Sequence, residues 1–568
     1  MSERGLRSAC WFQGDDVESF IRRSAMKVRG LRDEDFVDVP KIGVCTNWSE
    51  LARCHLHFGA LARWVKEGIQ QAGGLAFEFP SMSLGADLAV PAGATFMHRN
   101  LLAVEVEQTL SIYPLDAVVL IASCDETIPA MLMGAASAGV PAIILPGGPG
   151  LGGRFRGEEV GSGTDAGRNY DRYRAGEISP AEWRELEEHI ERSPGHCSTA
   201  GTASTLACVV EAMGLTEPGA AATPAVDSRR GEISRQTGRT AVALARQGVP
   251  VRDLLTDQAF ENGVRMLAAL AGSTNVVMHL LALARRAGSS LDLRTIDRIS
   301  RETPAIVDVK PAGRALMEDL FFAGGVPAVL GVLAPLLNLD APTVGGQTVA
   351  EVIAAAEPDH GREGIIHSLE DPLEKVGGIA AVFGNLAPDG AVIKRSVASP
   401  ELLRHRGPAI VFESREEMLR RLEDDALEVT PESVLVLKHG GPVGGPGMPE
   451  WGNLPLPRKM LRAGVRDMLR VSDSRMSGTA AGTAVLHVSP EAAVGGPLAA
   501  LRDGDMIELD VEGGRLEALL PEGEIARRLA ARKTRGAGPA RGYARLYAEH
   551  VTQAHDGCDF DFLAAAPR

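Results

Sequence analysis

Hydrophobic positions follow two different patterns along this chain, and the change between them lies near residue 375. In the first part, short unbroken apolar runs such as 117–122 and 141–145 flank stretches with helical spacing, an arrangement typical of a parallel sheet buried on both faces. In the later part the apolar runs are of β type: 391–393, 409–412, 433–437 and 506–511. The pattern predicts an α/β domain over residues 1–375 and a mostly β, barrel-like domain over residues 376–568.

Several local signals refine this outline. Thr127 is suited to cap a helix and Gly139 to end it, so the opening unit is predicted to be strand, loop, helix and strand. Residues 262–286 predict a pair of apolar helices, and the run 303–309 predicts a strand. Residues 1–40 are charged and show no clear period, and we expect an irregular arm there.

Composition excludes several classes of protein. Of the 568 residues, 45% are hydrophobic and 23% are charged, as in ordinary globular chains, and the length predicts at least two domains. A net charge of −15 argues against a nucleic-acid binder, because such proteins need basic surface. No apolar run approaches the roughly 18–20 residues of a membrane span. Seven cysteines without an apolar leader indicate reduced thiols in the cytoplasm.

Three cysteines share one local setting. Cys54, Cys124 and Cys197 each lie in a polar or glycine-containing loop just before a predicted helix, where the helix N-terminus favours the metal-binding thiolate. Any one of them could simply be a small buried residue, but three in the same setting favour a metal site. Asp125 and Glu126 follow Cys124 at the carboxyl end of a buried strand, where parallel sheets bind ligands. A metal site is therefore predicted at this loop.

A glycine-rich segment follows this unit. Gly148, Gly150 and Gly153 match the spacing of a dinucleotide-binding fingerprint, but that fingerprint requires a helix immediately afterwards. The residues after Gly153 do not predict one, so an active-site loop is the preferred interpretation.

A larger set of motifs carries a family resemblance. The motifs, in chain order, are Cys-Asp-Glu-Thr at 124–127 with Met-Gly-Ala-Ala at 133–136, Gly-His-Cys at 195–197 with Gly-Thr-Ala-Ser-Thr at 201–205, Gly-Ser-Thr-Asn at 272–275 with His279, Leu-Ala-Pro-Asp-Gly at 386–390, Gly-Gly-Pro-Gly-Met-Pro-Glu at 444–450, and Ser-Asp-Ser-Arg-Met-Ser-Gly-Thr at 472–479. Together they resemble the dihydroxy-acid dehydratase and phosphogluconate dehydratase family. Their amino-acid sequences are most similar to those of the branch that dehydrates sugar acids such as arabinonate and xylonate.

The resemblance implies two metal centres and a base. It implies a 2Fe–2S cluster held by the three cysteines already singled out, Cys54, Cys124 and Cys197. It also implies a Mg²⁺ ion, for which Asp125 and Glu450 match family ligands. The family base corresponds to Ser477, acting as an alkoxide, with Thr479 close by. The active site would then lie between the two domains, and His279 would be a hydrogen-bonded helix residue rather than a ligand.

Two positions depart from the family pattern. The family has a lysine after Cys-Asp that can carry a Mg²⁺-binding carbamate, and this chain has Glu126, a carboxylate on a shorter arm. The family also has a glutamate after Ser-Leu-Gly, where this chain has Ala86 followed by Asp87. We expect Glu126 to join the metal site, and Asp87 is a candidate substitute for the glutamate.

The predicted reaction is removal of water from a 2,3-dihydroxy sugar acid to give a 2-keto-3-deoxy acid. Two alternatives stay open: a dihydroxy-acid dehydratase of branched-chain amino-acid synthesis, and a non-catalytic cluster-binding homologue that acts as a sensor. The amino-acid sequences of the motifs weigh against the branched-chain dehydratase, and retention of Ser477 and Thr479 weighs against the sensor. The resemblance further implies a homodimer or homotetramer whose partner is a small sugar acid, with no nucleic acid and no membrane.

Overall fold

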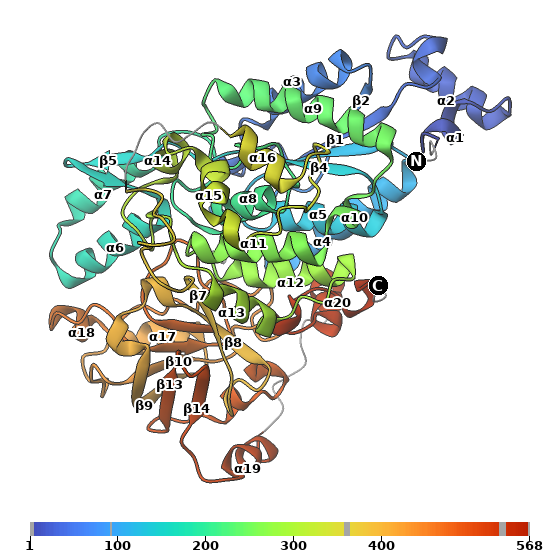
Figure 1. The fold of residues 1–568 in the computed structure, drawn as a ribbon. Coiled ribbons are helices and arrows are strands. Elements are labelled where there is room, and N and C mark those ends of the chain that lie inside the picture. Colours follow the sequence, from blue (N-terminus) through green and yellow to red (C-terminus); the bar gives the residue numbers. More distant parts are fainter. Residues whose placement is uncertain (1–4, 91–93, 357–363, 533–540, 566–568) are drawn as a thin grey trace.

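The computed structural model describes residues 5–90, 94–356, 364–532 and 541–565 (Figure 1). Its N-terminal half is built on a parallel sheet with the strand order β2-β1-β3-β4. These strands are β1 (Lys41–Thr46), β2 (Leu75–Pro80), β3 (Ala117–Ala122) and β4 (Ala142–Pro146). All residues of β1, β3 and β4 are buried, which is why their sequences are apolar without alternation.

Helices cover both faces of this sheet. The paired helices α3 (Phe58–Gln71) and α9 (Arg229–Gln247) lie on one face, and α4 (Phe96–Ile112) and α5 (Thr127–Ala138) lie on the other (Figure 1). Helix α5 ends at Gly139 with a φ of 64°, as predicted. Its N-cap residue, however, is Glu126, and Thr127 is the first helical residue. The Thr127 hydroxyl instead accepts a hydrogen bond from the Ser123 amide at 3.0 Å and so fixes the loop.

A second helical layer lies beyond α4 and α5. It contains α8 (Thr202–Ala212), α11 (Asp257–Ala269), α12 (Asn275–Ala287) and α13 (Leu293–Glu302), which confirms the helix pair expected over 262–286. Shorter helices complete the half: α10 (Val251–Leu254), α14 (Met317–Phe322), α15 (Gly325–Leu333) and α16 (Val349–Ala355). A lobe at one end carries β5 (Gly153–Phe155), β6 (Glu158–Val160), α6 (Ser162–Ala175) and α7 (Pro180–Ile190).

Two local expectations were wrong. The first 40 residues are not an irregular arm, because α1 (Ala9–Phe12) and α2 (Val17–Lys27) form there; residues 1–4 lie outside the described part. Asp16 caps α2 by accepting a hydrogen bond from the Ser19 amide at 2.9 Å. The run 303–309 makes only isolated bridges to loop residues, since no neighbouring strand among the described residues offers it a continuous edge.

The C-terminal half is built on an eight-stranded sheet with the order β14-β13-β9-β10-β11-β12-β8-β7. Its strands are β7 (Ile379–Val382), β8 (Gly390–Lys394), β9 (Arg404–Phe412), β10 (Val434–Leu437), β11 (Arg470–Ser472), β12 (Ala484–Ser489), β13 (Met506–Asp510) and β14 (Arg515–Ala518). Backbone bonds from Phe383 to Gly514 and Leu516 join its two ends, so the sheet nearly closes. This confirms the mostly β, barrel-like prediction. Three helices accompany it: α17 (Arg415–Leu422), α18 (Arg458–Arg462) and α19 (Glu524–Ala530).

The end of the chain ties the two halves together. After α20 (Gly542–His550), the segment returns to α4 and α12 of the N-terminal half. Asp559 accepts two hydrogen bonds from the fully buried Arg286, at 2.7 and 2.9 Å. Arg99 of α4 donates to the carbonyl oxygens of Gly557 and Cys558 at 2.9 and 2.8 Å. These buried, charge-assisted bonds hold the halves in a fixed relation, which the site between them requires.

Candidate active site

The three cysteines approach one another from three separate loops. Cys124 follows β3 with a φ of 76°, a left-handed conformation that turns its thiol away from the strand direction. Cys54 lies in a short 3₁₀ turn after β1, and Cys197 lies just before α8. The thiols of Cys54 and Cys124 are within hydrogen-bonding reach, and Cys197 lies near Cys54 and Asp125. All seven cysteines of the chain are free.

The pKa values of Cys124 and Cys197 depart from the expectation for helix N-termini. The hydrogen bond that the Cys124 thiol donates to Cys54, together with burial, raises the pKa of Cys124 well above its ordinary value, and burial raises that of Cys197. For Cys124 and Cys197 the expected lowering of the thiol pKa is therefore wrong in the protein without a bound metal, because the Cys54–Cys124 hydrogen bond and burial disfavour the thiolate. Nearby Arg53 works in the opposite direction and lowers the pKa of Cys197.

Arg53 is the cation on the thiol side of the site. It is mostly buried and pairs with Glu191 at 2.5 Å and with Asp87 at 3.7 Å. Asp87, the candidate substitute for a metal-binding glutamate, is thus placed against this arginine beside the thiols. Its loop continues through residues 91–93, which lie outside the described part of the chain.

The carboxylates gather around a different arginine. The fully buried Arg475 donates to Glu450 at 2.8 Å and to Glu126 at 3.1 Å, and its guanidinium lies 4.0 Å from Asp125. Burial, together with the charges of Glu126 and Glu450, raises the pKa of Asp125 well above its usual range. Burial also raises the pKa of Glu126, and the charge of Arg475 partly offsets this. Three acids thus share one buried cation.

The serine loop lies against the start of α8. The hydroxyls of Ser477 and Thr479 are 2.9 Å apart. Gly478 lies so close to the Thr202 amide that a Cβ there would be only 2.6 Å from its nitrogen, so a side chain at 478 would push the loop away.

Asn275 connects the serine loop to the acids. Its side-chain amide donates to the Thr202 hydroxyl at 3.2 Å and to Glu450 at 3.4 Å. Thr202 also hydrogen-bonds Asp125. The structure therefore brings all eight residues predicted from the sequence into one region between the halves.

The donor sets can be compared with the two metal centres that the resemblance implies. Among the described residues, no set of three or more His, Cys, Asp or Glu side chains has the spacing of a formed metal site. Three free thiols are the donors that an iron–sulfur cluster takes. On the acid side, Glu126 Oε2 is buried without a hydrogen-bond partner of good geometry among the described residues. Three carboxylates beside one guanidinium leave negative charge that a hard cation would neutralise, so both donor sets fit in their chemistry.

The histidines near the loops are held by neighbouring groups. His55 bonds Ser83 at 2.7 Å and the Ser123 carbonyl at 2.9 Å, and burial lowers its pKa to about 4. His196 bonds Ser204 at 3.0 Å, and burial lowers its pKa to about 3. His279 stacks on Phe96 with ring centroids 5.1 Å apart, and burial lowers its pKa well below the usual value. These imidazoles are therefore neutral at physiological pH.

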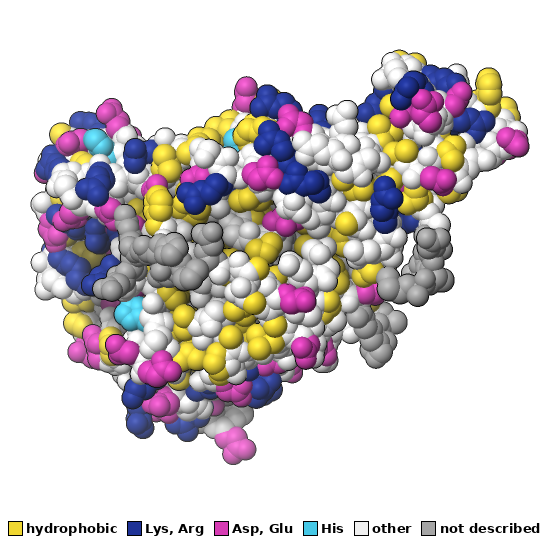
Figure 2. Space-filling view, turned by 45° about the horizontal axis from the view of Figure 1, so that its top comes forward, with side chains coloured by type: hydrophobic (Ala, Val, Ile, Leu, Met, Phe, Trp, Pro, Cys, Tyr) yellow, Lys and Arg dark blue, Asp and Glu magenta, His cyan; other side chains and the backbone are white. Residues whose placement is uncertain are grey.

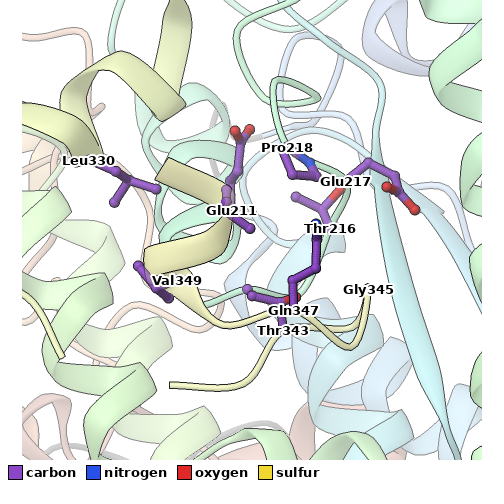
Figure 3. Close-up of a pocket in the computed structure, with 11 residues that line it drawn as sticks. Glu211, Thr216, Glu217, Pro218, Leu330, Thr343, Gly345, Gln347 and Val349 are labelled. Atoms are coloured by element: carbon purple, nitrogen blue, oxygen red, sulfur yellow. The ribbon is translucent and has the colours of Figure 1, made fainter. Parts of the chain in front are cut away.

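A separate pocket lies at the opposite end of α8 (Figure 3). It is lined by Glu211 and Glu217, whose carboxylates point in different directions in the close-up. Glu211 accepts from the amides of Gly219 and Ala221 at 2.6 and 2.8 Å, and Glu217 accepts from the Thr240 hydroxyl at 2.5 Å. Both acids are engaged in holding loops, so this pocket is not the candidate active site.

Sequence reasoning gave no role to Arg475, Asn275, Thr202 or Arg53. The first three lie inside the quoted motifs, so a signal was present. Their partners are far away along the chain, however; Arg475 and Glu126 are 349 positions apart. Arg53 lies in none of the quoted motifs, and its neighbour Cys54 was its only signal.

Comparison with known proteins identifies the class. Residues 39–352 match the profile described as "Dihydroxy-acid/6-phosphogluconate dehydratase N-terminal", and residues 364–558 match the corresponding C-terminal profile. L-arabonate dehydratase of Azospirillum brasilense is 49% identical over 98% of this chain and 97% of its own length. 6-deoxy-6-sulfo-D-gluconate dehydratase of Pseudomonas putida is 45% identical over 99% and 96%. Dihydroxy-acid dehydratase of Dehalococcoides mccartyi is 37% identical over 96% and 98%.

These matches cover both halves and therefore all of the site residues. The protein is a dehydratase, an enzyme that removes water from its substrate. The chain belongs to the dihydroxy-acid/6-phosphogluconate dehydratase family.

Proposed function

We propose that this protein removes water from a 2,3-dihydroxy sugar acid and releases a 2-keto-3-deoxy acid. One observation carries the proposal. The hydroxyls of Ser477 and Thr479 lie at the start of α8, close to the carboxylates that surround Arg475. The relatives named for sugar acids are 45–49% identical to this chain, against 37% for the dihydroxy-acid dehydratase, which favours the sugar-acid substrate.

The proposed chemistry begins at Ser477. Its Oγ, as an alkoxide, takes the proton from C2 of the acid, and Thr479, 2.9 Å away, donates a hydrogen bond that steadies the negative oxygen. The hydroxyl on C3 leaves and combines with a proton to form water. The resulting enol then takes a proton at C3, loses the proton of its C2 hydroxyl, and becomes the keto acid. No oxidant is needed, because the elements of water are lost and nothing else.

The two proposed cofactors would be held by the thiols and by the acids of the site. Cys54, Cys124 and Cys197 would hold a 2Fe–2S cluster, and Asp125, Glu126 and Glu450 would hold Mg²⁺. When bound, an iron with an open position supplies a Lewis acid for a leaving hydroxyl, and Mg²⁺ supplies positive charge for an enediolate. Arg475 positions Glu126 and Glu450, and Arg53 supplies positive charge beside the thiols.

The remaining expectations are also proposals. We propose that residues near 375 divide the chain into two domains, that the protein works in the cytoplasm, and that it forms a homodimer or homotetramer. Self-association is supported by α2, whose Val17, Phe20 and Ile21 share one helix face and are 69%, 65% and 58% exposed. The view in Figure 2 shows acidic and basic side chains intermixed, which gives no support for nucleic-acid binding. No helix in the described ranges has the length and apolar character needed to cross a bilayer.

The test is an assay of the purified protein against a panel of C5 and C6 aldonic acids, branched-chain dihydroxy acids and sulfogluconate. Formation of 2-keto-3-deoxy product from an aldonic acid supports the proposal. Turnover of branched-chain acids alone would favour the second dehydratase function. A protein that binds a cluster but converts none of these acids would favour the sensor.

A further inference from the structure

Lys394 is a buried lysine directly behind the serine loop. It is the last residue of β8, is 1% exposed, and pairs across the sheet with Ile379 of β7. Its ammonium nitrogen donates to the carbonyl oxygen of Gly478 at 3.4 Å. Gly478 lies between Ser477 and Thr479, so Lys394 contacts the backbone that carries both hydroxyls.

The surroundings of Lys394 offer little compensation for its charge. Among the described residues, no carboxylate forms an ion pair with it, and burial lowers its pKa to about 7. The adjacent strand β7 is apolar, and on the other neighbour, β12, the titratable group is His487, which interacts with Arg475. From the loop, the neutral carbonyl group of Gly478 faces the lysine. Arg395 follows Lys394 in the chain and is only partly buried.

A second buried lysine provides a contrast. Lys438, which directly follows β10 of the same sheet, is 3% exposed, but it pairs with Glu413 at 2.7 Å and donates to the Leu501 carbonyl at 2.8 Å. A lysine that serves packing alone is expected to have such partners, because an unpaired buried charge is costly. Among the described residues Lys394 has no ion pair, and its hydrogen bond goes to the loop that holds the base.

We propose that Lys394 is a positioning residue for Ser477: it holds the 477–479 loop through the Gly478 carbonyl and places a positive charge behind the hydroxyl that must lose its proton. This inference rests on the proposed function. The other face of the loop is fixed by Thr202 and Ser273, which Gly478 closely approaches. The lysine thus contacts the loop from the side of the barrel-like sheet.

The charge has a predictable effect on the reaction. A nearby cation favours the alkoxide over the neutral serine, and one unit in the pKa of Ser477 is about tenfold in alkoxide population. A lysine is charged below its pKa and neutral above it. The assistance is therefore present at lower pH and is lost as the pH rises through the pKa of Lys394, which gives the rate an alkaline limb near neutral pH.

The experiment compares K394M, K394R and the control K438M with the wild type, all with full cofactor content. kcat and KM are measured on the sugar acid from pH 5.5 to 9.5. We expect K394M to lose about tenfold or more in kcat, with little change in KM, and to lose the alkaline limb. K394R, whose charge persists, should move the limb to higher pH, because arginine stays protonated. K438M should leave the shape of the profile unchanged.

The inference is overturned if folded K394M keeps the wild-type profile, or if K394M and K394R lose activity equally while the limb stays in place. If K394M does not fold, K394R alone decides the inference. An alkaline limb at the wild-type pH in K394R then overturns the inference. If the wild type converts none of the acids, the proposed function fails. The inference is then decided by NMR titration of ¹³Cε-labelled lysine, with K394R identifying the signal. An ordinary lysine pKa for that signal overturns it, and a value near neutrality supports it.

Discussion

The three thiols of the site and its three carboxylates are positioned in different ways. Cys54, Cys124 and Cys197 all come from the N-terminal half, each from a loop just before a helix, beside the partly exposed Arg53. The acids come from both halves and share Arg475, which is fully buried and belongs to the C-terminal half.

The difference extends to the family pattern. By the resemblance described above, the thiols are expected to occupy the family positions, whereas on the acid side a glutamate is expected in place of the lysine and Ala86 in place of a glutamate. Under the proposed function, the soft-donor site would be retained as a unit, and the hard-donor site would be the part that differs. Experiments that separate the two sites test this contrast directly.

The largest effect is expected from Cys124→Ala. Removing one of three thiols should abolish cluster binding, so iron and sulfide content and turnover should all fall to background. Cys208→Ala is the matched control, because Cys208 is equally buried but lies within the apolar part of α8. Normal iron content in the Cys124 variant would show that the thiol group does not hold a cluster.

Ser477→Ala should lower kcat by about a thousandfold, within the range for loss of a positioned general base. Iron, sulfide and magnesium contents should stay at wild-type levels, since the serine lies outside both donor sets. Thr479→Ser, which keeps a hydroxyl near Ser477, is the control and should retain most activity. Full activity of the alanine variant would eliminate Ser477 as the base.

Glu126→Gln should weaken Mg²⁺ binding by roughly ten- to a hundredfold and leave iron content unchanged. The amide keeps an oxygen for Arg475 but removes a negative charge from the hard-donor site. Glu191→Gln provides the matched change beside the thiols and should leave Mg²⁺ binding intact. Equal Mg²⁺ affinities in the two variants would contradict the division into two sites.

The smallest effect is expected for Glu211, which belongs neither to the thiols nor to the acids of the site. Burial raises the pKa of Glu211 to about 7. An acid with a raised pKa binds its proton more tightly in the folded state, so its contribution to stability is full below pH 4.5 and declines as the pH rises through about 7. The decline amounts to about 3 kcal/mol at most. Glu211→Gln should therefore show a flatter dependence of unfolding free energy on pH between 5 and 8, measured by urea titration. A slope equal to that of the wild type would contradict the raised pKa.

Much of this contrast could be predicted from the sequence, but unevenly. The buried strands and the helix that ends at Gly139 follow from unbroken apolar runs and a single glycine, which are local signals. The helix α2 was missed because its apolar residues Val17, Phe20 and Ile21 are largely exposed and its polar neighbours hide the period. The run 303–309 has strand composition, but whether it pairs depends on an edge elsewhere in the fold.

The site shows the same limit. The thiols were identifiable because each one marks its own loop. The role of Arg475 was not, because it exists only when residues 349 positions apart meet. The Cys54–Cys124 hydrogen bond and burial also reversed the expected direction of the pKa shifts of Cys124 and Cys197, and both are properties of the folded chain rather than of the loop sequence.

The most direct test of the account is anaerobic purification of the wild-type protein, followed by iron, sulfide and magnesium analysis and assay on aldonic acids in the same preparation. We expect about two irons and two sulfides per chain, bound magnesium, and conversion of at least one aldonic acid to a 2-keto-3-deoxy acid. A folded, cluster-loaded protein that converts no 2,3-dihydroxy acid would contradict the proposed sugar-acid dehydratase activity.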